Sequence, residues 1–91
     1  MSDLPRRVGP AVEDVLEVEV DGRITLYRRE GEVALVLNDT ASDVWRLCDG
    51  EHDVDEIVRL LAAAYAADAE GIRPQVEDAV RRFHDERLLT S

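Results

Sequence analysis

Hydrophobic and polar residues alternate in the first third of the chain, and this alternation predicts β-strands. Leu16, Val18 and Val20 alternate with Glu17 and Glu19. A two-residue period gives a strand one buried face and one solvated face. We therefore expect the three aliphatic residues to face the core and the two glutamates to face water.

A hairpin turn is predicted directly after this strand. Asp21-Gly22 separates it from a second alternating run, Arg23–Arg28. Asp-Gly suits a two-residue hairpin turn because both turn positions need a positive φ angle. Beyond a second turn at Gly31, residues 33–37 are almost continuously apolar. The front of the chain thus predicts a three-stranded antiparallel meander.

The pattern changes to a helical one at Asn38, where apolar residues begin to recur every three or four positions. Asn38 or Asp39 is suited to cap a first helix, and Gly50 is placed to end it in a left-handed conformation. Asp53 and Glu56 are spaced as a capping-box pair for a second helix.

The third helix is expected to start near Pro74, because proline is tolerated in the first turn of a helix. Residues 66–73 would then form a loop or short turn, and Leu88 and Leu89 would fold back onto the core. Strands followed by helices predict an α+β fold: a three-stranded antiparallel sheet, then three helices, winged helix-turn-helix-like in shape. The 91 residues suffice for one domain. We place it at residues 13–91, after a flexible N-terminal lead-in at residues 1–12.

Charge narrows the class of partner. The formal net charge is -10, with 11 basic and 21 acidic residues. An acidic chain repels phosphate backbones, so we expect a peptide or protein partner and no nucleic acid. No apolar run approaches the roughly 20 residues of a membrane helix. Residues 1–10 lack the apolar core of a signal peptide, so we expect a cytoplasmic protein with no membrane partner.

The sequence shows no pattern of catalytic or metal-binding residues. His52 and His84 are the only histidines, Cys48 is the only cysteine, and their spacing does not match a zinc site. The acidic run at residues 49–56 lacks the ligand positions of a calcium loop, and no acid–base pair can be identified. We expect no catalytic residue, no metal and no cofactor, and we expect Trp45 and Cys48 to lie in the core.

Two features suggest binding. One is the mixed polar surface beside the apolar stripe of the third helix, for which a solvated face is the default interpretation; its residues are Gln75, Asp78, Arg81, Arg82, Asp85 and Glu86. The other is the third strand. It is apolar on both faces, yet a three-stranded sheet has two edges. An edge presents unpaired N–H and C=O groups that can accept an added strand from a peptide. The alternative is that a helix or a dimer partner covers this edge.

The stretch from Leu37 to Gly50 resembles the PqqD family. Members of that family carry a similar Leu-Asn-x-Thr-Ala stretch, an aliphatic-Trp pair and a closing Asp-Gly; here these are Leu37-Asn38-Asp39-Thr40-Ala41, Val44-Trp45 and Asp49-Gly50. The likeness continues through residues 54–58, Tyr65 and residues 76–83, and ends at Leu88-Leu89. It therefore covers roughly residues 15–90, although the connection at residues 67–73 departs from the usual Tyr-x-x-Asp link.

The resemblance implies a RiPP recognition element, a non-catalytic peptide chaperone. Such a domain binds the leader of a ribosomally synthesised precursor peptide as an added strand, in the cleft between its third strand and third helix. It presents the leader to a modifying enzyme: a radical SAM protein in pyrroloquinoline quinone biosynthesis, or a leader peptidase in lasso peptide biosynthesis. Carried onto this chain, the resemblance places peptide binding at Val33, Ala34, Leu35, Val36, Leu37, Ala79, Arg82, Phe83 and Glu86.

Two alternatives remain open from the sequence. A winged-helix DNA-binding regulator would share the shape, but the charge of -10 opposes it. A structural dimerisation subunit would pair its apolar edge with itself and form a homodimer.

Overall fold

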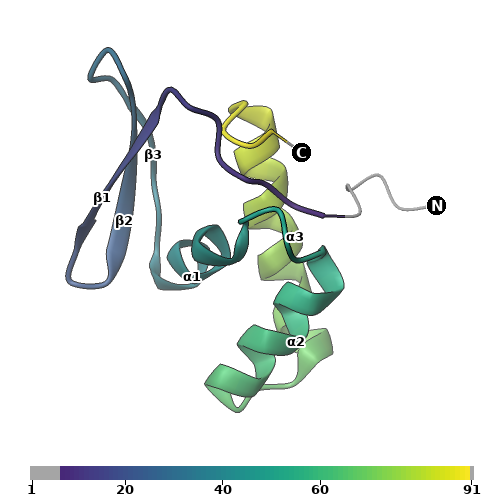
Figure 1. Cartoon of the computed structure of the whole chain (residues 1–91). Coiled ribbons are helices and arrows are strands. Elements are labelled where there is room, and N and C mark those ends of the chain that lie inside the picture. The colour runs from purple at the N-terminus through teal and green to yellow at the C-terminus, as the bar shows by residue number, and fades with distance from the viewer. Residues whose placement is uncertain (1–6, 91) are drawn as a thin grey trace.

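Three antiparallel strands precede three helices in the computed structural model, which describes residues 7–90 (Figure 1). The strands are β1 (Val15–Val20), β2 (Arg23–Arg28) and β3 (Val33–Val36). The helices are α1 (Asp39–Leu47), α2 (Val54–Tyr65) and α3 (Ala69–Asp85). The strand order β1-β2-β3 makes β1 and β3 the sheet edges. The predicted α+β fold is confirmed.

The hairpin between β1 and β2 has the predicted turn. Asp21 and Gly22 have φ angles of 54° and 83°, as a turn with two left-handed residues requires. The strands pair from Val15 opposite Arg28 to Val20 opposite Arg23. Between β2 and β3 the register is irregular, because Leu26 lies opposite Leu35 while Tyr27 lies opposite Val33. Ala34 is therefore the bulged residue of β3.

The prediction for the two faces of β1 was wrong. Leu16, Val18 and Val20 are 51%, 48% and 64% exposed. The alternate residues Glu17 and Glu19 make side-chain hydrogen bonds to helix α1. The aliphatic residues of β1 therefore lie on the outer face of the sheet, away from the helices.

Contacts with helix α1 explain why the glutamates of β1, and not its aliphatic residues, face inward. The Trp45 indole N–H and the Arg46 guanidinium lie under β1, and each donates to a glutamate of that strand, at 3.2 Å and 2.6 Å. Aliphatic side chains there would leave the Trp45 indole N–H without its acceptor and would remove the Glu19 acceptor of Arg46, which also donates to Asp43 and to the Gly22 carbonyl. Strand β2 supplies the sheet's contribution to the core through Ile24 and Leu26, both fully buried.

Helix α1 begins as predicted but ends earlier. The Asn38 side chain caps it by accepting from the Ala41 N–H at 2.8 Å. Its last residue is Leu47 and its C-cap is Cys48, whose φ angle is -85°, so Gly50, with a φ angle of 86°, lies beyond the helix and does not end it. The fully buried Ser42 joins this helix to the sheet, since its hydroxyl oxygen accepts from the Ile24 N–H at 2.9 Å.

Helix α2 has the predicted capping box. The Glu56 N–H donates to the Asp53 carboxylate at 2.8 Å, and the Asp53 N–H donates back to the Glu56 carboxylate at 3.2 Å. Each residue thereby satisfies a main-chain donor that the helix start leaves unpaired.

Helix α3 starts earlier than predicted. Asp68 caps it, accepting from the Gly71 N–H at 3.2 Å, and Pro74 lies inside the helix rather than at its first turn. The expected departure from the Tyr-x-x-Asp link was therefore wrong, because Tyr65 ends α2 and Asp68 caps α3. The residues before the proline hold this turn in place: Ile72 is only 4% exposed, and Arg73 pairs with Asp55 of α2 at 2.7 Å. These contacts offset the one helical hydrogen bond that Pro74 cannot make.

The two ends of the described chain pack together. Ala11 forms an antiparallel bridge with Leu89, and the Thr90 N–H donates to the Pro10 carbonyl at 2.8 Å. Leu88 and Leu89 are 0% and 8% exposed, which confirms that they fold back onto the core. Residues 1–6 of the expected lead-in lie outside the described residues, and the packed chain begins at Val8, which is fully buried.

No helix within residues 7–90 combines the length and apolarity needed to cross a membrane.

Candidate functional site

Strand β3 has one paired edge and one open edge. It pairs only with β2 in the described sheet. The Leu37 N–H donates to the Ile24 carbonyl at 2.9 Å, and hydrogen bonding alternates along an antiparallel pair. The N–H and C=O groups of Leu35 therefore point toward β2, whereas those of Val36 point to the open edge. An added strand would find a donor and an acceptor at Val36.

The side chains of β3 differ in accessibility. Val33 and Val36 are 56% and 67% exposed, and Ala34 and Leu35 are partly buried against the core. Leu37 follows the strand and is 1% exposed. Of the five strand residues expected to bind peptide, Leu37 is thus a core residue, because the chain turns inward there to enter α1.

A pocket lies between the end of β3 and helix α3. Its volume is about 100 Å³. The N-terminal turn of α1 forms one wall and α3 forms the other; the lining residues are Asn38, Thr40, Ala41, Gln75, Asp78, Ala79 and Arg82. No Cα of β3 comes within 8 Å of a Cα of α3. The pocket therefore lies between α1 and α3, just past the end of β3, and no residue of β3 lines it.

The residues expected on α3 are divided between this pocket and the core. Ala79 lines the pocket and is 4% exposed, and the exposed Arg82 stands at its rim. Phe83 is 1% exposed and packs edge-on against Trp45, with ring centroids 5.1 Å apart. Glu86 is exposed, and its main-chain carbonyl accepts from Arg28 of β2.

Four polar residues of the pocket were not among those expected to bind peptide: Asn38, Thr40, Gln75 and Asp78. Gln75, Asp78 and Arg82 are spaced three and four residues apart, so they share one face of a helix. That spacing was visible in the sequence. Asn38 and Thr40 lie within the Leu-Asn-x-Thr-Ala stretch, and they face α3 across the pocket.

Arg82 supplies the positive charge of the pocket. Within residues 7–90 its guanidinium makes no hydrogen bond or ion pair. Surface arginines in so acidic a chain readily find carboxylates, as Arg23, Arg46 and Arg73 do. The Arg82 side chain is therefore available to a carboxylate on a bound molecule.

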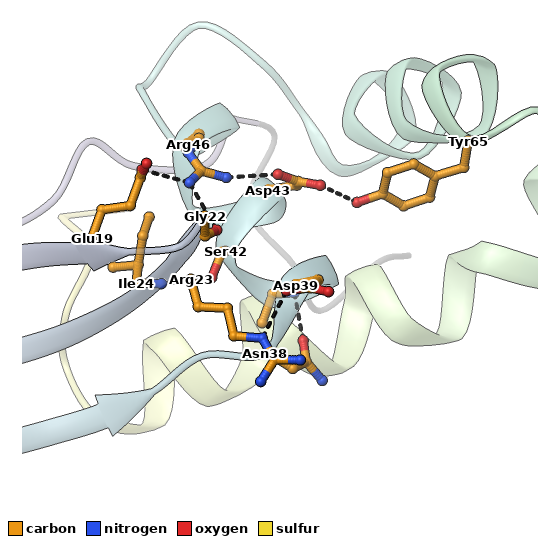
Figure 2. Close-up of polar contacts among 11 residues, drawn as sticks. Glu19, Gly22, Arg23, Ile24, Asn38, Asp39, Ser42, Asp43, Arg46 and Tyr65 are labelled. Carbon is orange, nitrogen blue, oxygen red and sulfur yellow. Dashed lines mark hydrogen bonds and ion pairs between the residues drawn. The ribbon is translucent and has the colours of Figure 1, made fainter.

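A network of polar side chains centred on α1 links the sheet to the helices. Figure 2 shows Arg46 between Glu19 of β1 and Asp43 of its own helix, with Asp43 also accepting from the Tyr65 hydroxyl of α2. Burial, with the Asp43 carboxylate, raises the pKa of Tyr65 to about 12, so the hydroxyl stays a donor. The network joins β1, α1 and α2.

The remaining reactive side chains have structural surroundings. Burial raises the pKa of the Cys48 thiol to about 12, and this thiol donates to the Val44 carbonyl. His52 lies 3.0 Å from the Asp49 carboxylate. Among the described residues, no three His, Cys, Asp or Glu side chains are grouped so that they could hold a metal ion.

Comparisons with known proteins agree with this architecture. Residues 23–89 match the sequence profile of the family described as coenzyme PQQ synthesis protein D (PqqD). A curated relative from Methylococcus capsulatus, named PqqA binding protein, is 38% identical over 60 residues, or 66% of this chain. The matched region spans 60% of the length of that relative.

A solved structure, described as TbiB1 in complex with the TbiA(beta) leader peptide, shares the fold. Its TM-score to this chain is 0.74 at 22% sequence identity, and the superposition covers 89% of this chain and 94% of the other. The arrangement of three strands and three helices is thus found in a solved structure.

Proposed function

Since this chain belongs to the PqqD family, we propose that it is a peptide chaperone in RiPP biosynthesis. It binds the leader of a ribosomally synthesised precursor peptide by strand addition and presents it to a modifying enzyme. The open edge of β3, with a pocket beside it, is the observation that carries this proposal. One relative is named for binding PqqA, and the structural neighbour was solved with a leader peptide.

In this proposal the leader lies between β3 and α3. Its main chain pairs with Val36, which gives affinity with little dependence on sequence. One leader side chain enters the pocket over Ala79, and a leader carboxylate pairs with Arg82. The core residues Leu37 and Phe83 support the site from beneath, and Val33 to Leu35 line its edge. Glu86, at the C-terminal end of α3, flanks the site with its exposed side chain.

The chain itself is non-catalytic in this proposal. Cys48 is buried with a raised pKa, which disfavours a nucleophilic thiolate. The chemistry belongs to the partner, a cytoplasmic radical SAM protein or leader peptidase.

The direct test is calorimetric titration of the chain with a synthetic leader from the precursor encoded beside its gene. We expect saturable one-to-one binding. A series of leaders, each N-methylated at one successive position, then tests strand addition. Because alternate residues of a strand hydrogen-bond to the same neighbour, affinity should fall at every second position. No binding of the unmodified leader contradicts the function, and losses without a two-residue period contradict strand addition.

A homodimer through β3 is the competing use of this edge. In that case sedimentation would show a dimer that the leader does not dissociate. We expect instead that the leader-bound chain contains a single copy.

A further inference from the structure

The outer face of the sheet is apolar and uncovered. We define this outer sheet face by its exposed aliphatic residues: Leu16, Val18, Val20, Val33 and Val36. Five of the seven large hydrophobic side chains that are exposed in the described chain lie here. Figure 1 shows all three helices on the opposite side of the sheet. Contiguous apolar patches of this kind mark surfaces that another molecule covers.

The centre of this face is continuous across the three strands. Thr25 lies opposite both Val18 and Val36, and Tyr27 lies opposite both Leu16 and Val33. Directly opposed residues share a sheet face, so two rows run from β1 to β3. The carboxylates of β1 are absent from these rows, because Glu17 and Glu19 contact α1 on the inner face.

Exposing the aliphatic side chains of β1 to water costs an isolated domain free energy that their burial would provide. A shift of one residue in the pairing of β1 would exchange its faces and bury its aliphatic residues. The Asp21-Gly22 turn and the bonds from Trp45 and Arg46 prevent that shift. The chain thus keeps three aliphatic side chains in water on a strand whose acidic residues contact its own helix.

The outer sheet face is also continuous with the peptide edge. Val33 and Val36 belong to both surfaces. A leader added beside β3 would extend the sheet by one strand, and its alternate side chains would lie on the outer side next to these valines. A molecule that covers this face therefore touches the bound leader as well.

We propose that the modifying enzyme docks on the outer sheet face and reads the leader and β3 together. This inference rests on the proposed function. The aliphatic rows of this face carry no carboxylate of β1, because Glu17 and Glu19 contact α1, so the rows suit an apolar enzyme surface. A second copy of the chain is a poorer occupant, since it would bring a further -10 charge.

The test compares three proteins: the wild type, the double variant Leu16→Gln/Val18→Thr and the control Leu60→Gln. Threonine keeps the shape and strand preference of valine. Leu60 is a matched control because it is 46% exposed, close to the 51% of Leu16, but lies on α2. Circular dichroism first checks that each variant is folded.

Two probes are titrated against each protein: the synthetic leader alone, and the co-encoded radical SAM protein or peptidase in the presence of saturating leader. We expect the double variant to bind the leader within about twofold of the wild type. It should bind the enzyme about tenfold more weakly, while Leu60→Gln binds both probes like the wild type.

The outcomes separate the two proposals. Failure of the wild type to bind leader removes the proposed function. Normal leader binding with equal enzyme affinity in the wild type and the double variant overturns the docking surface alone, as does an equal loss in Leu60→Gln. If the wild type is a dimer and the double variant is a monomer, the outer sheet face is occupied by a second copy of the chain, and the enzyme docking surface is overturned.

Discussion

Arg82 is the basic side chain of the pocket between α1 and α3. It is exposed at the rim of the pocket and makes no polar contact within the described chain. Its neighbour in sequence, Phe83, is in the core. One step along the helix thus separates an exposed pocket residue from a core residue.

Replacing Arg82 tests the role of this charge. We expect Arg82→Gln to weaken leader binding about fivefold, the size of one charge-assisted contact at a solvated site. The loss should shrink as salt is raised, because ions screen the pair. Arg59→Gln is the matched control, since Arg59 is an exposed arginine on α2, away from the pocket. Calorimetry at two salt concentrations measures both; equal affinities for Arg82→Gln and the wild type would contradict the contact.

Cys48 should be unreactive while the protein is folded. Burial raises its pKa from 9.0 to about 12, so almost no thiolate exists at pH 8. Ellman's reagent should modify the native protein slowly and the urea-unfolded protein at once. Rapid native modification would mean that the thiol is accessible.

The same pKa shift predicts a pH dependence of stability. Because the folded pKa is above the unfolded value, the stabilisation is complete below pH 9 and is lost as the pH rises toward 12. Urea unfolding of the wild type and Cys48→Ala should therefore show the wild type losing stability relative to the variant between pH 8 and pH 10.5. A constant difference across this range would contradict the shift.

At the scale of elements, local signals predicted the turns and caps well. The Asp21-Gly22 turn and the Asp53–Glu56 capping box depend on residues close in sequence, and both are present. The faces of β1 were mispredicted because they depend on Trp45 and Arg46, far along the chain. Hydrophobic periodicity shows that a strand has two faces, but tertiary contacts decide which of them is inside.

The start of α3 shows a second limit of local signals. Pro74 was taken as a helix start, yet the packing of Ile72 carries the helix back to Ala69. The same limit applies to the site. The sequence identified β3 and one side of α3, but only the fold separates the exposed Val36 from the buried Leu37.

Ser42 links the sheet to α1, and its removal should weaken that junction. In Ser42→Ala the Ile24 N–H would lose its acceptor in a fully buried position. We expect a loss of about 2 kcal/mol in the free energy of unfolding, the cost of a buried unsatisfied donor. Urea denaturation measures it. A loss below about 0.5 kcal/mol would show that another acceptor replaces the hydroxyl.

At the scale of the whole molecule, the N-terminal segment is part of the packed structure. The Val8 N–H donates to the His52 carbonyl at 2.9 Å, and the Gly50 N–H donates to the Val8 carbonyl at 2.8 Å. This segment therefore covers the connection between α1 and α2. Nothing periodic marks it in the sequence, because its structure comes from contacts with residues about 40 positions away.

Gly9 makes the closest of these contacts. Its φ angle is 91°, and a Cβ there would lie 2.1 Å from the Cys48 carbonyl oxygen. We expect Gly9→Ala to lower the free energy of unfolding by about 3 kcal/mol or more, from strain and overlap combined. Gly31→Ala is the control, since its φ is 96° but nothing lies within 4 Å. It should cost only about 1 kcal/mol. If thermal unfolding shows equal losses of stability in Gly9→Ala and Gly31→Ala, the overlap with the Cys48 carbonyl makes no contribution.

The Ala11–Leu89 bridge has a consequence for architecture. Because the two ends of the described chain lie at neighbouring points, the fold can serve as a cassette. Spliced into a surface loop of a larger protein, it would need only short linkers. With the proposed function, such a cassette grafted onto an enzyme would tether the bound peptide to that enzyme and raise the local concentration of substrate at its active site.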